Sequence, residues 1–156
     1  MGDPQVGPTK TLLPPDPYAE AAARAFVAQA TRTRIVFSQN TGQILWIDGR
    51  GGALWPAGDC STADTARALA VAFLQAHSGL LRIRDADADL SLAEPFLARD
   101  AIFIQDPQSG TRAVRLEQSI NGFTSPDHYV IAHFGADCAL NALVTTAQPT
   151  DASASQ

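Results

Sequence analysis

The ten residues VRLEQSINGF, at positions 114–123, decide the fold. One face of this stretch carries Val114, Leu116, Gln118 and Ile120. The other face carries Arg115, Glu117 and Ser119, together with Ala113, which directly precedes the stretch. This alternation is typical of a β-strand with two unlike faces. The strand ends at Asn-Gly, the strongest short-range hairpin signal, and HYVIAHF (128–134) supplies the returning strand. We expect Gln118, which lies among apolar neighbours, to bond to backbone near the turn, because an unpaired buried amide is costly.

Further strands are expected on both sides of this hairpin. Leu90 and Leu92 suggest a short strand, residues 101–105 another, and ALNALVTT (139–146) a last one. The short connections imply antiparallel pairing, because parallel strands need longer crossovers. The sequence therefore predicts an antiparallel meander.

One strong helix precedes the meander, at residues 61–78. Its apolar stripe consists of Ala66, Leu69, Ala70, Phe73, Leu74 and His77, at helical spacing. Ser61 with Asp64 makes a capping box, and Gly79 stands where a left-handed cap ends a helix. We expect this helix to cover the apolar face of the sheet.

A second helix and a hairpin are expected near the N-terminus. Residues 16–30 begin with Asp16 as the cap and Pro17 at the first helical position. Residues 33–48 form two β-rich runs around QNTG (39–42), which predicts a hairpin with a four-residue loop. Its apolar residues occupy both faces, so one face is expected to meet the core and the other the first helix or another domain.

The domain organisation follows from these elements. Residues 1–15, with four prolines, are expected to be a flexible lead-in, and AQPTDASASQ (147–156) a disordered tail or a linker cut short. Residues 16–146 form a single α+β domain: an N-terminal helix and hairpin (16–59) and a core (61–146) with one main helix on a curved antiparallel sheet.

Composition excludes some classes of function. The chain has 156 residues and a formal net charge of −5, from 16 acidic and 11 basic residues. Phosphate backbones repel such a surface, so no nucleic-acid partner is expected. No apolar run approaches the roughly 20 residues of a transmembrane helix, so no membrane-spanning segment is expected.

The search for catalytic motifs finds no H-E-x-x-H, no G-x-S-x-G and no phosphate-binding loop. His77 lies on the apolar face of its helix and is interpreted as structural. Strand alternation places His128 and His133 on opposite faces, which argues against a shared metal site. The best acid–base alternative groups Glu94, Asp100, Asp127 and His128. We expect a non-enzymatic chain without a cofactor.

DADAD, residues 85–89, is a weak calcium candidate. Asp85, Asp87 and Asp89 match positions 1, 3 and 5 of an EF-hand loop, but Leu90 and Phe96 occupy positions 6 and 12, where the loop needs Gly and Glu. A solvated acidic turn after the helix is the favoured interpretation.

The two cysteines, Cys60 and Cys138, permit one disulfide or two unpaired thiols, and the residues leave both open. Of the two tryptophans, Trp46 is favoured as a core residue, whereas Trp55, in a Gly/Pro-rich loop, is more open. Both are also candidates for partner contact, because aromatic residues are enriched at binding hot spots.

Residues 61–146 resemble the fungalysin/thermolysin propeptide domain. The resemblance rests on four stretches in order: AVAFLQAHSGLLRI (70–83), DADLSL (87–92), RAVRLEQSINGF (112–123) and HYVIAHFGADCALNALV (128–144). It covers roughly half of the chain. Two departures exist: Phe123-Thr124-Ser125-Pro126 replaces the family's Pro-Val-Phe/Tyr-Gly, and Cys138 replaces a glycine in the last turn, which fits a disulfide to Cys60.

The resemblance implies a cystatin-like fold and a role without catalysis. Such domains are pro-regions of secreted zinc metalloproteases, which assist folding of the protease and hold it inactive. It implies a protease catalytic domain as partner, in cis or in trans, a secreted or extracytoplasmic location, and partner contacts at Phe123, Thr124 and Ser125. The alternative is a stand-alone cell-envelope binding or adhesion domain that uses the hairpin 33–48 or the acidic loop 85–89 as its working surface. One version of this alternative adds stabilisation of the domain by calcium.

Overall fold

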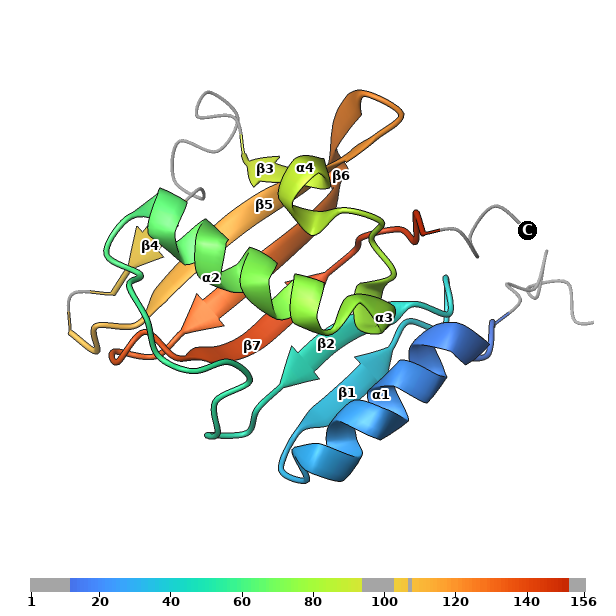
Figure 1. Cartoon of the computed structure of the whole chain (residues 1–156), viewed down its shortest axis with the longest axis horizontal. Coiled ribbons are helices and arrows are strands. Elements are labelled where there is room, and N and C mark those ends of the chain that lie inside the picture. Colours follow the sequence, from blue (N-terminus) through green and yellow to red (C-terminus); the bar gives the residue numbers. More distant parts are fainter. Residues whose placement is uncertain (1–11, 94–102, 107, 152–156) are drawn as a thin grey trace, which may run out of the picture.

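The computed structural model describes residues 12–93, 103–106 and 108–151. They form an α+β fold in which helix α2 (Ala63–Ala76) lies across one face of a seven-stranded antiparallel sheet (Figure 1). The predicted fold class is confirmed: one main helix packs on the sheet, and an additional helix and hairpin precede it.

The strands follow the order β1-β2-β7-β6-β5-β3, and β4 also pairs with β5. Their bounds are β1 Arg34–Phe37, β2 Ile44–Asp48, β3 Leu90–Leu92, β4 Phe103–Gln105, β5 Arg112–Ile120, β6 Phe123–Phe134 and β7 Leu140–Thr145. β4 and β3 share the outer side of β5, opposite residues 112–114 and 116–118 respectively. The N-terminal hairpin therefore supplies the other edge of the sheet, strand β1.

The hairpin predicted from Asn121-Gly122 is present, and both turn residues have positive φ angles, 52° and 84°. Its second strand contains an irregularity that the sequence did not indicate. Glu117 pairs with Tyr129 but Gln118 pairs with Ser125, so residues 126–128 lie outside the ladder. This bulge places Asp127 and His128 away from regular strand positions, and the face expected for His128 from alternation does not apply.

The N-cap of helix α2 lies one residue later than expected. Thr62, not Ser61, is the N-cap and forms a capping box with Thr65, while the Ser61 hydroxyl donates to Asp59 Oδ1 at 2.6 Å. The expectation that Gly79 is the left-handed residue that ends this helix is also wrong. A short helix, α3 (Ser78–Leu81), follows directly and contains Gly79; the left-handed residue is Arg82, with φ 59°.

Helix α1 (Pro17–Gln29) is capped as predicted, because Asp16 Oδ1 accepts from the Tyr18 N–H at 2.9 Å. α1 packs against α3, and Gly79 makes this approach possible. A Cβ at position 79 would lie 2.9 Å from Ala22 Cβ, closer than side-chain carbons normally approach. Gly79 thus serves helix–helix packing and not helix termination.

The core lies between α2 and the facing side of the sheet. Its largest fully buried apolar side chains are Phe73, Phe134, Ile47, Leu80, Leu90, Leu116, Leu140, Leu143, Val114 and Val130. His77 joins this core as a structural residue, edge-on to Phe26 with ring centroids 4.8 Å apart. Burial lowers the pKa of His77, which keeps the ring neutral within an aromatic environment.

The expected tail at 147–156 is wrong for residues 147–151, which are packed against the domain. Ala147 is buried, Gln148 bonds to Gln118, and Asp151 accepts from Arg82 at 3.0 and 3.2 Å. The physical reason is that this polar segment satisfies buried polar groups of the core. Residues 152–156 lie outside the described residues.

Part of the expected lead-in is also attached. The Leu13 N–H donates to Gln39 O and the Asp16 N–H to Gly42 O, both at 2.7 Å, so residues 12–15 follow the loop of the β1–β2 hairpin. Residues 1–11 lie outside the described residues. Among the described helices, none has the length and apolar character required to cross a membrane.

Candidate functional site

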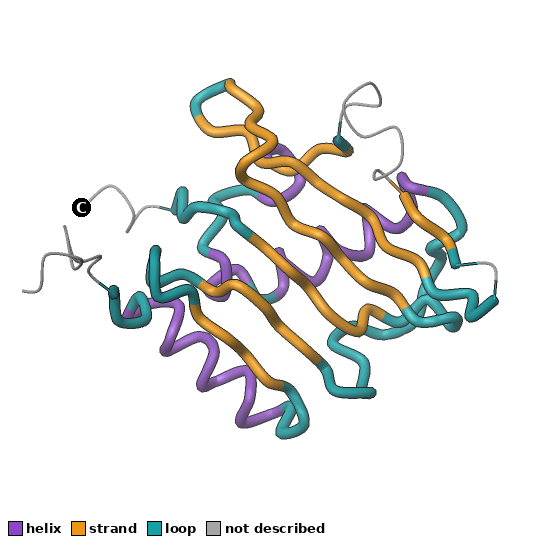
Figure 2. Tube along the Cα trace, turned by 180° about the vertical axis from the view of Figure 1, so that it is seen from behind, coloured by secondary structure: helices purple, strands orange, loops and turns teal. Residues whose placement is uncertain are grey.

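The face of the sheet opposite α2 carries a row of side chains across five strands. Seen from behind, the strands lie in front of all described helices, so no described helix covers this face (Figure 2). Residues paired across strands point to the same face. Strand register gives the members of the row, which we call the open-face row: Val36, Trp46, Val144, Ile131 and Arg115.

Four of the five members of the open-face row are apolar. Trp46 is 37% exposed, and Val36, Ile131 and Val144 are partly buried. The adjacent row, from Ile35 through Ile47 and Leu143, points the other way into the core. An antiparallel sheet with one solvated face usually places polar residues there, so this continuous apolar row is the candidate interaction surface of the sheet.

The row ends at a fixed cation. The Arg115 guanidinium lies over the Tyr129 ring, 4.3 Å from its centroid, and donates to Pro126 O at 2.8 Å. Glu117, which is buried, lies 3.7 Å from Arg115 Nε. These contacts hold the guanidinium in one position, so the row offers apolar contact along its length and a positioned charge at its end.

The two tryptophans occupy the reverse of their expected environments. Trp46, favoured as a core residue, belongs to the open-face row, whereas Trp55 is partly buried and edge-on to Phe73 and His77, with ring centroids 6.1 and 6.2 Å apart. The register shift between Val36 and Phe37 is responsible, because Ile44 and Ile47 then both turn inward and Trp46 turns outward. Trp46 is therefore the more exposed of these two partner-contact candidates, and Trp55 is the more buried.

The other partner-contact candidates lie at the tip of the β5–β6 hairpin, which projects beyond the rest of the sheet (Figure 1). Phe123 is 80% exposed. Thr124 Oγ1 lies 2.6 Å from Ser119 Oγ, and Ser125 Oγ accepts from the Asp127 N–H at 3.1 Å. Thr124 and Ser125 thus stabilise the hairpin, while Phe123 is the free apolar side chain at its tip.

The three calcium candidates have other partners. Asp85 caps the short helix α4 (Ala86–Asp89), Asp87 pairs with Arg67 at 3.2 Å, and Asp89 pairs with Arg84 at 3.3 Å. In residues 12–93, 103–106 and 108–151, no three His, Cys, Asp or Glu side chains converge in a way that could hold a metal. The acidic stretch is one turn of helix with ion-paired carboxylates.

The predicted acid–base group is only partly in view, since Glu94 and Asp100 lie outside the described residues. Asp127 and His128 line a cavity of about 500 Å³ between the β1–β2 loop, the β6 bulge and the C-terminal segment. His128 Nδ1 lies 3.3 Å from Thr146 O. His133 lies elsewhere, paired with Ala113 and Ala142.

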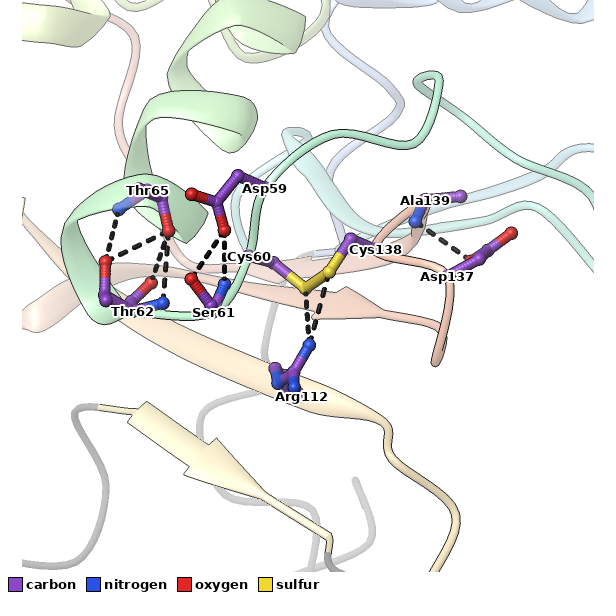
Figure 3. The surroundings of a disulfide bond; sticks show 9 residues. All are labelled: Asp59, Cys60, Ser61, Thr62, Thr65, Arg112, Asp137, Cys138 and Ala139. Carbon is purple, nitrogen blue, oxygen red and sulfur yellow. Dashed lines mark hydrogen bonds between the residues drawn. A yellow bond between two sulfur atoms is a disulfide. The ribbon is translucent and has the colours of Figure 1, made fainter.

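The two cysteines are joined in a disulfide (Figure 3). The bond links the segment before α2 to the β6–β7 turn, with Cα atoms 5.4 Å apart. Arg112 Nη1 donates to both sulfurs, at 3.2 and 3.3 Å. Cys138 has a φ of 67°, a left-handed conformation that favours glycine. The bond fixes α2 to the strands that carry the open-face row.

No family model matches this chain, and the searches of curated proteins and of solved structures found no match.

Proposed function

We propose that the chain is a non-catalytic protein-binding module, the pro-region of a secreted thermolysin-like metalloprotease, which assists the folding of the protease domain and inhibits it. The observation that carries the proposal is the open-face row, an apolar surface on the rigid central strands. The protease domain is the polypeptide that covers this surface.

The physical mechanism needs no chemistry in the module. A surface that binds the near-native protease better than its unfolded chain shifts the folding equilibrium towards the native state by mass action. Such a surface must be preformed, because ordering it on binding would reduce the affinity. The disulfide between Cys60 and Cys138 and the packing of α2 against the sheet provide this rigidity.

Trp46 is the natural centre of the contact. It is the second residue of the row, between Val36 and Val144, and tryptophan is enriched among residues that dominate binding energy. Inhibition follows if the bound module blocks the active-site cleft of the protease, which requires only that it remain attached.

The resemblance to the propeptide domain gains support at one position. The family has a glycine where this chain has Cys138, and the backbone there is left-handed, with φ 67°. A glycine adopts this conformation without strain. The β5–β6 hairpin and the main helix on an antiparallel sheet also agree with the expected arrangement.

The test begins with the coding sequence beyond residue 156. If it encodes an H-E-x-x-H protease domain, that domain is refolded from denaturant with and without the chain. We expect the chain to raise the yield of folded protease and to suppress its activity, and Trp46→Ser to weaken both effects at least tenfold. Leu45→Ser is the matched control, because Leu45 is a neighbouring apolar residue, 39% exposed, outside the row.

The absence of such a coding sequence would contradict the pro-region role in cis. A wild-type chain that changes neither the yield nor the activity of the protease would reject the role altogether. Equal effects of the two variants would show that the open-face row is not the contact.

A further inference from the structure

The cavity of about 500 Å³ beside the bulge in β6 takes no part in the proposed protease contact. Its lining residues come from the β1–β2 loop, the start of β2, the bulge, the end of β7 and the C-terminal segment, and none of them belongs to the open-face row. Cavities that hold small molecules have volumes of about 300–1,000 Å³ and combine apolar walls with a few placed polar groups. The size of this cavity therefore suits a small organic molecule.

The apolar part of the cavity wall is made by Ile44, Leu45, Ala147 and Pro149. Ile44 and Ala147 are buried, while Leu45 is 39% exposed and Pro149 is partly buried. An aromatic or aliphatic group placed here would remove apolar surface from water, which favours binding. The polar part of the wall then decides the chemistry of the ligand.

The charge of the wall is carried by Asp127. No Lys or Arg is found among the lining residues in the described part of the chain. The backbone of Asp127 is bonded, because its N–H donates to Ser125 Oγ at 3.1 Å and its C=O accepts from the Thr146 hydroxyl at 2.7 Å. Its carboxylate has no hydrogen bond or ion pair within residues 12–93, 103–106 and 108–151. The bulge places this carboxylate at the cavity, as bulges often re-aim side chains.

Two neutral side chains add hydrogen-bond acceptors. Thr146 O lies 3.3 Å from His128 Nδ1 and can only accept, so Nδ1 carries the proton and Nε2 of the neutral ring is an acceptor. Gln43 Nε2 donates to Asp16 Oδ2 at 2.9 Å, which fixes the orientation of its amide. Gln43 Oε1 is buried and has no hydrogen-bond partner among the described residues. The wall therefore combines one negative charge with acceptors that lack donors, and both attract a cation.

We propose that this cavity binds a small organic cation, a primary amine on an aromatic or aliphatic body. The ammonium group lies against the Asp127 carboxylate and His128 Nε2, where it also offsets the unpartnered Gln43 Oε1. The body lies against Ile44 and Ala147. A primary ammonium has three donors and no acceptor, which complements this wall. The inference goes beyond the proposed function, because it concerns a different site and a ligand that is not a protein.

The test titrates the full chain, labelled with ¹⁵N, with 2-phenylethylamine to about 20 mM, because a ligand of so few atoms binds weakly. Its amine is protonated at pH 7, like that of lysine. We expect saturable shifts of the amide signals of residues 41–45, 127–128 and 145–148, and of the Gln43 side-chain amide. The neutral alcohol on the same body, 2-phenylethanol, should bind about fivefold more weakly. The anion 3-phenylpropionate should bind more weakly still.

Two matched variants test the charge. Asp127→Asn keeps the size of the side chain and both backbone hydrogen bonds, and should weaken amine binding about fivefold. Asp64→Asn makes the same change of net charge at an exposed position of α2 outside the cavity, and should leave the affinity unchanged. Trp46→Ser, in the open-face row, should also bind the amine as the wild type does, which separates this site from the proposed protease contact.

A further arm distinguishes a free amine from the lysine side chain of a partner protein. Nα-acetyl-lysine methylamide carries the same charge without the ring and should bind more weakly than 2-phenylethylamine. Equal or tighter binding would assign the cavity to a protein side chain and overturn the proposal. Equal binding of the three phenylethyl compounds, equal affinities of the two aspartate variants, shifts confined to other residues, or an absence of shifts would also overturn it.

Discussion

Gln118 and Gln148 hydrogen-bond to each other twice, although 30 residues separate them. Gln118 Nε2 donates to Gln148 O, and the Gln148 N–H donates to Gln118 Oε1, both at 2.8 Å. The Gln118 side chain is fully buried. The Gln118 side-chain amide therefore bonds to the backbone N–H and C=O of Gln148, as a neighbouring strand would, and holds the C-terminal segment against the core.

Replacing this amide should destabilise the domain. Gln118→Met keeps the approximate volume but leaves the Gln148 N–H and C=O without their partner, so we expect a loss of about 1–3 kcal/mol, measured by urea unfolding. Gln148 takes part through its backbone alone, and its residue is exposed. Gln148→Ala should therefore change stability by less than about 0.5 kcal/mol; equal losses from both variants would contradict this account.

Arg82 links the two ends of the described chain through Asp16 and Asp151. Burial raises the pKa of Asp16, but hydrogen bonds from the Gln43 side chain, the Tyr18 N–H and Arg82 outweigh it and hold the pKa below its ordinary value. A depressed folded-state pKa contributes stability that is present above the unfolded value, about 4, and is lost as the pH falls through the folded value.

Asp16→Asn isolates this contribution, because asparagine is an equally good N-cap but carries no charge. We expect the variant to be less stable than the wild type at neutral pH. The difference should shrink as the pH falls from about 4 towards 2, measured by thermal unfolding across that range. A difference that stays constant with pH would show that the charge of Asp16 is not the stabilising feature.

Gly79 should resist substitution by alanine. In an ordinary helix this change is favourable by about 0.5–1 kcal/mol, but here the new methyl group would lie 2.9 Å from Ala22 Cβ. We expect Gly79→Ala to lower the unfolding midpoint in a thermal melt, and Ala22→Gly in the same chain to recover part of the loss. A stabilised single variant, or no coupling between the two changes, would mean that α1 and α3 are not held this closely.

Removing the disulfide should weaken the domain more than any of these changes. The bond closes a loop across 78 residues of sequence. The combined change Cys60→Ser and Cys138→Ser should cost about 2–5 kcal/mol, measured by urea unfolding without reductant. A thiol titration of the denatured wild-type chain should find no free thiol; two free thiols would contradict the bond.

The elements that could be predicted from the sequence are those whose signals are local. Asn121-Gly122 sets its hairpin through its own backbone preferences, and Asp16-Pro17 sets the start of α1 in the same way. The amphipathic stripe around Phe73 likewise identifies α2 and its buried side. Each of these signals lies within one turn or one helix, so no knowledge of the rest of the chain is required.

The remaining features depend on pairing between distant segments. The hairpin 33–48 is apolar on both faces, so only the register shift at Val36 and Phe37 decides that Trp46 faces outward. The packed segment 147–151 makes its contacts largely through backbone and small polar groups, which leave no apolar pattern to read. The open-face row itself consists of single residues from five strands and exists only once the register is known.

The most direct test of the central claim, that the open-face row binds a protease domain, is a comparison of dissociation constants by calorimetric titration. The partner in this titration is the catalytic domain of a thermolysin-like protease. We predict that Trp46→Ser weakens binding at least tenfold, about 1.4 kcal/mol, while Leu45→Ser binds as the wild type does. Equal affinity of the wild type and Trp46→Ser would contradict the account.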